Sequence, residues 1–284
     1  MGFTNKKLAY LEIILAMIIW GSVGILARLI PFSSKIIVFY RVLFAFISLS
    51  LYTFLKGEYN IDIEDNKIYV IIATGFFLAL NWLFFFKAIK TTTIAAATIS
   101  YYTSPIILSF LAVFLLKEKM NLKVIISLIS SFIGLILIIS TNGIDTVSPR
   151  LIGIFYGLTA AFFYALFSVT NKMIKAVSSL KLTLIQSGIA TLIFIPFILP
   201  LEIPDIKSLL LLIFMGVFHT AFALILYLDG LSKVKAHNVG ILSYIDPLSA
   251  VILAALFFNE IPGYMTIIGA IFILASGYIS VKGN

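Results

Sequence analysis

The chain has 284 residues, of which 62% are hydrophobic and 11% are charged, and its mean hydropathy is +1.15. A soluble domain carries about 25% charged residues, so this composition excludes a water-soluble globular protein and indicates lipid as the main solvent. The chain has no cysteine and two histidines, which excludes a disulfide framework and argues against a metal centre, while the net charge of +8 is scattered between apolar runs rather than gathered in a nucleic-acid-binding patch.

Ten apolar runs of about 20 residues follow one another, and each is long enough to cross a bilayer as a helix. They are predicted at residues 8–29, 35–55, 68–88, 93–115, 122–141, 150–171, 181–200, 207–228, 236–257 and 262–281. Short polar segments separate them, so neighbouring helices are expected to be antiparallel. The fold class predicted is an all-α integral membrane protein with ten transmembrane helices.

Lysine and arginine are unevenly divided between the two sides of this topology. With the N-terminus in the cytoplasm, the cytoplasmic segments hold 13 of them and the outer segments hold 6, with Arg41 left inside a helix. Basic residues are enriched in cytoplasmic loops. We therefore expect a multi-pass protein of the cell membrane with both termini cytoplasmic.

Two segments near the middle of the fourth and ninth runs resemble each other. ISYYTSP (99–105) aligns with ILSYIDP (241–247) at an offset of 142, and WGSVGILAR (20–28) aligns with YALFSVTNK (164–172) at an offset of 144. The chain is therefore read as two five-helix repeats, at 8–141 and 150–281. Because five is odd, the second repeat is inverted in the membrane, which is a recurring architecture of secondary transporters with a site near the midplane.

Ionisable residues inside apolar runs are the first candidates for function, because burying a charge in lipid is costly. Asp246 lies near the centre of the ninth run and His219 near the centre of the eighth. Asp246 serves either substrate binding and ion coupling or a structural role beside Pro247, and His219 serves as its partner or as a neutral hydrogen-bond donor. Glu12 is either an ion-coupling group or an interfacial carboxylate. Arg41 either extends to the interface or pairs with a carboxylate of the protein or of the substrate.

Two prolines at matched positions, Pro105 and Pro247, are expected to kink the fourth and ninth helices, because proline lacks an N–H and clashes with the carbonyl four residues earlier. They are predicted to be structural hinges. Further candidates for substrate binding are polar and aromatic residues at central depth, each of which is otherwise an ordinary packing residue. These are Trp20, Asn81, Tyr102, Tyr164 and Tyr244.

The motifs resemble those of the EamA branch of the drug/metabolite transporter superfamily across residues 9–281. They are IIWGSVGILAR, the arginine of FYRVLFAFISL, AIKTTTIAAATISYYTSPI with LLKEK, and GLSKVKAHNVGILSYIDPLSAVILAALFFNEIP. The resemblance implies inverted EamA-like repeats around a central cavity, in which Tyr102 and Tyr244 face each other. It also implies transport of amino acids, other metabolites or drugs.

The function expected is a secondary transporter that exports small metabolites such as amino acids by alternating access. The alternatives are an intramembrane enzyme acting on a lipid-linked substrate, an uptake carrier for a small cation or sugar derivative, and a channel. No nucleotide-binding loop is present and no catalytic constellation stands out. We therefore expect no cofactor, no metal, no nucleic acid, a small-molecule substrate, and a monomer or homodimer in the bilayer.

Overall fold

The computed structural model describes residues 3–57, 68–92, 94–140, 151–174, 177–199, 203–258 and 263–282. Across these ranges the chain is helical and contains no strand. Seven helical stretches are long and apolar enough to cross a membrane, and two shorter apolar helices accompany them at Leu122–Ile138 and Tyr264–Ile279. The all-helical membrane fold is confirmed in this form, whereas the count of ten crossings stays a prediction.

The elements of the first half follow the predicted apolar runs. They are α1 (Phe3–Gly21), α2 (Val23–Leu29), α3 (Ser34–Lys56), α4 (Ile68–Thr91), α5 (Ile94–Tyr101), α6 (Ser104–Leu115) and α7 (Leu122–Ser140). Because lipid offers no partner for a free N–H or C=O, apolar runs of this length fold into helices that bond internally. The end of α3 is set by Gly57, whose φ of 68° is left-handed and directs its N–H to Phe54 O and Thr53 O.

The elements of the second half repeat this order. They are α8 (Leu151–Met173), α9 (Ser179–Phe194) with the 3-10 turn η2 (Ile195–Phe197), α10 (Ile206–Phe214), the π-helix η3 (Met215–Phe222), α11 (Ala223–Lys233), α12 (Ala236–Ser243), α13 (Ile245–Phe258) and α14 (Tyr264–Lys282). The Asp205 carboxylate begins α10 by accepting the Ser208 N–H at 2.6 Å.

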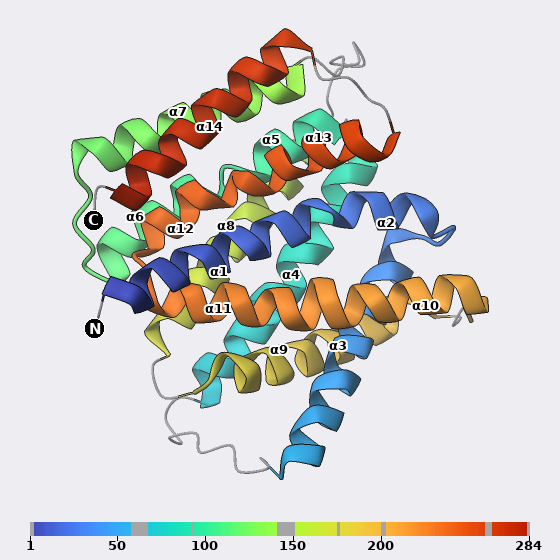
Figure 1. The fold of residues 1–284 in the computed structure, drawn as a ribbon. Coiled ribbons are helices and arrows are strands. Elements are labelled where there is room, and N and C mark those ends of the chain that lie inside the picture. Colours follow the sequence, from blue (N-terminus) through green and yellow to red (C-terminus); the bar gives the residue numbers. More distant parts are fainter. Residues whose placement is uncertain are drawn as a thin grey trace.

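The two halves interleave, as Figure 1 shows. Helix α4 of the first half packs along α8 of the second, and α11 of the second half packs along α1 of the first. Helices α7 and α14 pair with each other, and so do α3 with α9 and α6 with α12. The α4–α8 and α1–α11 contacts are counterparts in which the first and second halves exchange places, and so are the contacts of α6 with α8 and of α13 with α1. The α7–α14 and α3–α9 pairs join equivalent helices, so these contacts follow the pattern expected of two repeats related by a two-fold axis.

Glycines allow the closest helix approaches. A Cβ at Gly21 of α1 would lie 2.6 Å from Asp246 O and 3.0 Å from Ala250 N, so the backbones of α1 and α13 meet there. Gly157, in the small-residue motif GIFYG, packs against Ser100 of α5 inside the bundle. That motif therefore makes a contact within the bundle.

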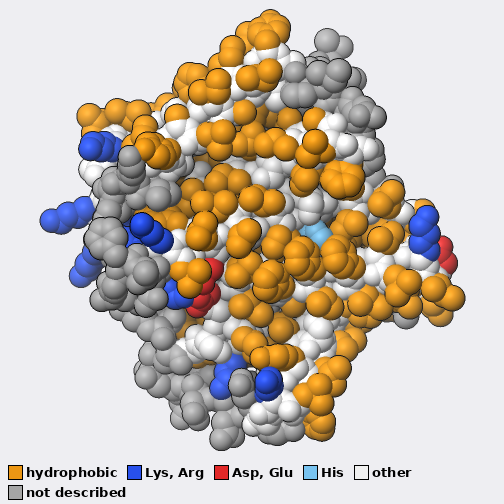
Figure 2. All heavy atoms as spheres, viewed as in Figure 1, with side chains coloured by type: hydrophobic (Ala, Val, Ile, Leu, Met, Phe, Trp, Pro, Cys, Tyr) orange, Lys and Arg blue, Asp and Glu red, His pale blue; other side chains and the backbone are white. Residues whose placement is uncertain are grey.

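The molecule presents a hydrophobic face with charged ends. In Figure 2 hydrophobic side chains cover the middle of the face, and the Lys, Arg, Asp and Glu side chains that are drawn gather toward its rim. The start of α1 and the end of α14 lie at the same end of the bundle in Figure 1. An apolar belt between charged ends is the surface that a bilayer requires.

Candidate functional site

Breaks in the helices bring polar groups into the middle of the bundle. Helix α1 gives way to α2 at Ser22, α5 to α6 at Tyr102 and Thr103, and α12 to α13 at Tyr244. The π-helix η3 lies between α10 and α11, in the middle of one long helical stretch. Such interruptions are tolerated at membrane depth only where protein or a wet cavity satisfies the backbone, and π-turns occur frequently at functional sites.

The two prolines lie at the starts of helices. Pro105 is the second residue of α6 and Pro247 is the third residue of α13. Proline is tolerated in the first turn because the N–H it lacks would have no partner within the helix. The structure thus differs from the expected kinked helix. Each of the two predicted helices is divided into two shorter helices, α5 and α6 or α12 and α13, with a break just before the proline.

Asp246 lies in the first turn of α13, directly after the break. The Tyr102 hydroxyl group faces its carboxyl group and interacts with it. Tyr101 and Tyr164 also lie within electrostatic reach of this carboxyl group. The Asp246 residue as a whole is half-buried.

The two tyrosines of the repeated segments meet. The Tyr244 hydroxyl group donates a hydrogen bond to the Tyr102 carbonyl oxygen at 3.0 Å, and the ring centroids are 6.2 Å apart. The two residues are 142 positions apart, which is the offset between the repeated segments. The bond joins the break before α6 to the break before α13.

Trp20 and His219 lie together at the junction of α1 and α2 with η3. The Trp20 indole N–H donates to the His219 carbonyl oxygen at 2.9 Å, and the Ser22 hydroxyl group hydrogen-bonds His219 Nε2 at 2.8 Å. His219 is 2% exposed. Among the residues that the structure describes, no hydrogen bond joins His219 to Asp246, which has Tyr102 as its neighbour instead.

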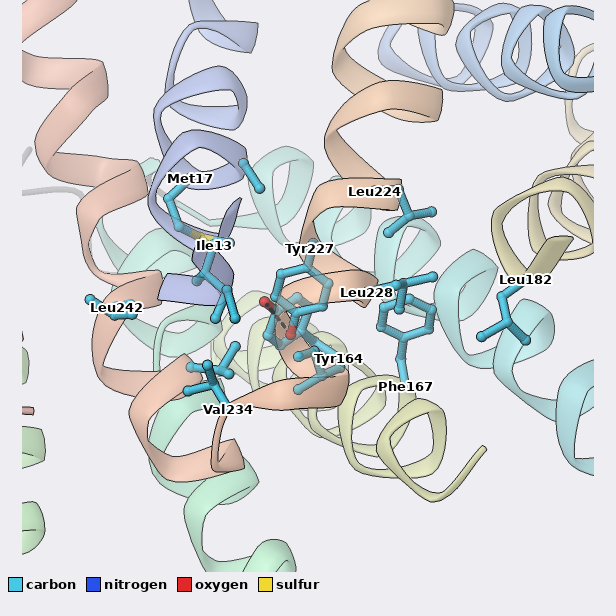
Figure 3. Close-up of a cluster of buried hydrophobic side chains, with 14 of the residues drawn as sticks. Ile13, Met17, Tyr164, Phe167, Leu182, Leu224, Tyr227, Leu228, Val234 and Leu242 are labelled. Carbon is cyan, nitrogen blue, oxygen red and sulfur yellow. Dashed lines mark hydrogen bonds between the residues drawn. The ribbon is translucent and has the colours of Figure 1, made fainter. Parts of the chain in front are cut away.

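Asn81 and Tyr164 form buried hydrogen bonds to other helices. Asn81 Nδ2 donates to the Ala160 carbonyl oxygen at 2.9 Å. The Tyr164 hydroxyl group donates to the Tyr227 hydroxyl group at 3.1 Å, and Tyr227 also hydrogen-bonds Ser168 at 2.7 Å. Figure 3 shows the pair of tyrosine hydroxyl groups enclosed by hydrophobic side chains of several helices.

Glu12 lies apart from these residues, in an ionic group with Lys233 and Asp229. Lys233 Nζ is 3.6 Å from Glu12 Oε2 and also pairs with Asp229 Oδ2. Glu12 is eight residues before Trp20 on α1, which corresponds to roughly 12 Å along the helix axis. It therefore belongs to the end of the bundle that holds both termini.

Glu118 makes a second polar contact between the halves at that same end. Both of its carboxylate oxygens accept the Ala236 N–H, at 2.9 and 3.0 Å, and one lies 3.0 Å from His237 Nδ1. Burial alone would raise the pKa of this carboxyl group. The hydrogen bonds from His237 and Ala236, together with the nearby Lys172 ammonium, outweigh burial and hold the pKa below its usual value.

Glu118 is the glutamate of the LLKEK segment that follows the fourth predicted run. It reaches α12 because Lys117 adopts a left-handed φ of 55° after α6 ends. The matching Glu260 lies outside the described residues.

Several site residues had no signal in the sequence. The Tyr101 ring packs tilted against the Phe85 ring with centroids 4.4 Å apart, and the Tyr227 and Trp20 ring centroids are 5.2 Å apart. One pattern could have found Tyr227, because subtracting the repeat offset of 142 leads to Phe85, the neighbour of Tyr101. Nothing in the sequence marks η3, because a π-turn leaves no periodic pattern in a run that is apolar on all sides.

The arrangement suits a small organic cation. A carboxyl group surrounded by tyrosines offers a counter-charge and hydroxyl acceptors, and the rings of Trp20, Tyr101 and Tyr164 offer negative π faces for an ammonium group. No group of three or more His, Cys, Asp or Glu side chains suited to a metal ion occurs among the residues described.

Comparison with known proteins identifies the family. The model of the EamA-like transporter family matches this chain twice, at residues 7–140 and 151–281. An uncharacterized transporter of Bacillus subtilis, YxxF, is 28% identical over 275 residues, which cover 95% of this chain and 88% of that protein. An S-adenosylmethionine uptake transporter of Rickettsia prowazekii is 24% identical over 239 residues, which cover 84% of this chain and 79% of that protein.

A solved crystal structure shares the fold. Its TM-score is 0.83 at 16% sequence identity, over 97% of this chain and 99% of that one. The family and these relatives are described as transporters and not as enzymes. Since the family model accounts for nearly the whole length in two copies, the chain is a transporter that belongs to the EamA-like family, as its motifs predicted within the drug/metabolite transporter superfamily.

Proposed function

We propose that this transporter moves a small amino compound, such as an amino acid, by alternating access to a site around Asp246. The observation that carries the proposal is the placement of that carboxyl group. It lies at a helix break between the two halves, with Tyr102 of the first half and Tyr164 of the second beside it. A site shared by two halves can change its exposure when one half moves against the other.

The proposed topology has ten crossings in two inverted five-helix repeats, with both termini in the cytoplasm. Two observations support an even number of crossings: the ends of the chain lie on the same side in Figure 1, and the family model matches twice. The exchange of contacts between the halves supports the two-fold relation. The bias of 13 basic residues against 6 supports a cytoplasmic position for the terminal side.

In this proposal the site is closed on the cytoplasmic side. Glu118 of the first half binds Ala236 and His237 of the second, and Glu12 of the first half pairs with Lys233 of the second. These contacts must separate for the site to open toward the termini. The breaks before Pro105 and Pro247 are the proposed hinges, because the backbone there is already released from continuous helix bonding.

Asp246 has two uses in such a cycle. It binds the ammonium group of the substrate, or it takes up and releases a proton as the site changes sides, and the same carboxyl group can do both in turn. Trp20, Asn81, Tyr244 and His219 complete the proposed substrate site, and Glu12 is proposed to affect coupling through the cytoplasmic contact.

Export is the direction proposed first, and uptake is the second candidate. One relative favours uptake, since the similar protein of Rickettsia prowazekii is described as an S-adenosylmethionine uptake transporter. S-adenosylmethionine has an amino-acid end and a positive charge, which also suits a carboxyl group lined by tyrosines.

A metabolite-release screen tests the proposal. Cells that overproduce the protein should release at least one amino compound faster than cells that overproduce the Asp246→Asn variant at an equal level. Liposomes containing the purified protein should then transport that compound, at a rate that depends on an imposed pH gradient. The proposal would be refuted if both cell lines released every compound at the same rate and neither took up any of the compounds screened.

A further inference from the structure

Arg41 is a buried cation that the proposed cycle does not use. Its residue is 7% exposed, on the part of α3 that packs against η3. Its Nε donates to the Thr220 hydroxyl oxygen at 2.9 Å, and its guanidinium carbon lies 5.1 Å from the centre of the Trp82 ring. Both partners are uncharged, so neither neutralises the guanidinium group.

No described carboxylate serves as the counter-ion of Arg41. Each acidic side chain in the described ranges has a different neighbour: Glu12 and Asp229 have Lys233, Glu118 has His237, Asp205 has the Ser208 N–H, and Asp246 has Tyr102. Arginine stays protonated in proteins and carries five N–H donors. The Thr220 bond uses the Nε donor and leaves the four donors of the two terminal nitrogens.

A buried charge without a counter-ion is costly in the interior of a membrane protein, and the usual reason to keep one is a ligand of opposite charge. We propose that Arg41 binds the carboxylate group of the transported compound. The compound is then an amino-acid-type zwitterion whose ammonium group lies at Asp246. This inference rests on the function proposed above and narrows its substrate class.

The contacts connect Arg41 to Asp246 through the junction of α1 and α2. Arg41 bonds Thr220, and the preceding residue, His219, bonds Ser22 of the junction. The neighbour of Ser22, Gly21, lies against the backbone carbonyl group of Asp246. Through these contacts Arg41 and Asp246 are both linked to the junction of α1 and α2, and the proposed zwitterion is placed at that junction.

A carboxylate fits Arg41 better than a phosphate does. The guanidinium group has one positive charge and a planar set of donors that matches the two oxygens of a carboxylate. A phosphate monoester dianion at this position would keep one negative charge without compensation. Trp82 below the guanidinium group holds its plane in place, which leaves its edge for the ligand.

Tryptophan fluorescence tests this assignment directly. The chain has two tryptophans, Trp20 and Trp82, and both lie at the site. The full-length protein in nanodiscs is titrated with neutral L-amino acids, each paired with its amide, beginning with L-leucine and L-leucinamide. The two members of a pair share the ammonium group and the side chain, and only the amino acid has a carboxylate.

We expect at least one amino acid to change the fluorescence with an apparent Kd at least tenfold lower than that of its amide. In Arg41→Gln the amino acid should bind at least tenfold more weakly while the amide binds as in the wild type, and Arg41→Lys should fall between. Lys87→Gln is the matched control, because the Lys87 ammonium group also lies over aromatic rings, 5.6 Å from Phe84 and 5.7 Å from Tyr156. It should leave both affinities unchanged.

Equal affinity of every amino acid and its amide in the wild type would overturn the inference, even if the Arg41 variants fail to fold. Wild-type affinity for the amino acid in a folded Arg41→Gln protein would overturn it as well. Absence of binding by every amino acid would also overturn it. The release screen separates this failure from failure of the proposed function: a transported compound without a carboxylate removes the role of Arg41 and leaves transport at Asp246 in place.

Discussion

The contact of Glu118 with α12 predicts how strongly the closed state of the transporter is stabilised. The substitution Glu118→Gln keeps one oxygen as an acceptor for the Ala236 N–H and removes the charge that faces His237, Lys172 and the start of α12. Loss of a capping group costs about 1 kcal/mol, and loss of a charge at a helix N-terminus costs roughly 0.3–1 kcal/mol. Because the glutamine keeps part of the cap and water screens part of the charge, we expect a net loss of about 1 kcal/mol from the closed state.

A loss of about 1 kcal/mol changes the ratio of closed to open molecules about fivefold. The chain has no cysteine, so a single Ser243→Cys substitution in buried α12 can report opening. A membrane-impermeant maleimide added on the side of the termini should label this cysteine about five times faster in Glu118→Gln than in the parent protein. Asp205→Asn is the matched control, since Asp205 also caps a helix but binds Ser208 within its own half.

The pH dependence has a definite sign. The pKa of Glu118 is lowered in the folded protein, so the contact is intact above the usual carboxyl value of 4.5 and is lost as the pH falls through the lowered pKa. The labelling rate of the parent protein, divided by that of a fully exposed cysteine at the same pH to remove the loss of thiolate, should therefore rise only below about pH 4.5. The same ratio for Glu118→Gln should change less. Equal labelling rates in the parent, Glu118→Gln and Asp205→Asn proteins would show that Glu118 only caps α12 and does not hold the cytoplasmic side closed.

Three further predictions concern packing, hinges and topology. Gly21→Ala should reduce the free energy of unfolding by about 1–3 kcal/mol and lower the melting temperature, because its Cβ would meet the α13 backbone. Gly277→Ala is the control and should melt like the parent protein, because the atom nearest to its Cβ, Leu242 Cδ2, is 3.6 Å away. Equal melting temperatures of the two variants would contradict the close approach of α1 and α13. The double variant Pro105→Ala, Pro247→Ala should reach the membrane at a normal level and transport more slowly, and full transport activity would remove the proposed hinges. A tag after Asn284 should be protected from an impermeant reagent outside intact cells, and labelling from outside would contradict the ten-crossing topology.

The apolar runs predicted the positions of the long helices closely, because the length and hydrophobicity of a segment decide whether it can cross a lipid bilayer. The repeat offset predicted more than length could. It made Tyr102 and Tyr244 equivalent positions, the family resemblance implied that they face each other, and the structure joins them by a hydrogen bond. Internal symmetry carries three-dimensional information, because equivalent positions of two inverted halves meet at the axis that relates them.

The helix breaks and the polar contacts inside the bundle could not be predicted from the sequence. Pro105 and Pro247 predicted a kink, but the structure places each proline in the first turn of a new helix, and the Tyr244 hydroxyl group hydrogen-bonds the Tyr102 carbonyl oxygen between the two breaks. The partners of Arg41 and His219 lie some 180 to 200 residues away in the chain. Such pairs follow from packing of distant helices, which no local pattern encodes.

The central claim is that transport passes through the carboxyl group of Asp246, and one measurement tests it most directly. The compound found by the release screen is supplied to proteoliposomes that contain equal amounts of wild-type or Asp246→Asn protein, with and without a pH gradient, and its accumulation is measured. The account predicts gradient-dependent accumulation with the wild type and none above empty liposomes with Asp246→Asn. Accumulation by Asp246→Asn at the wild-type rate, with the wild-type response to pH, would contradict it.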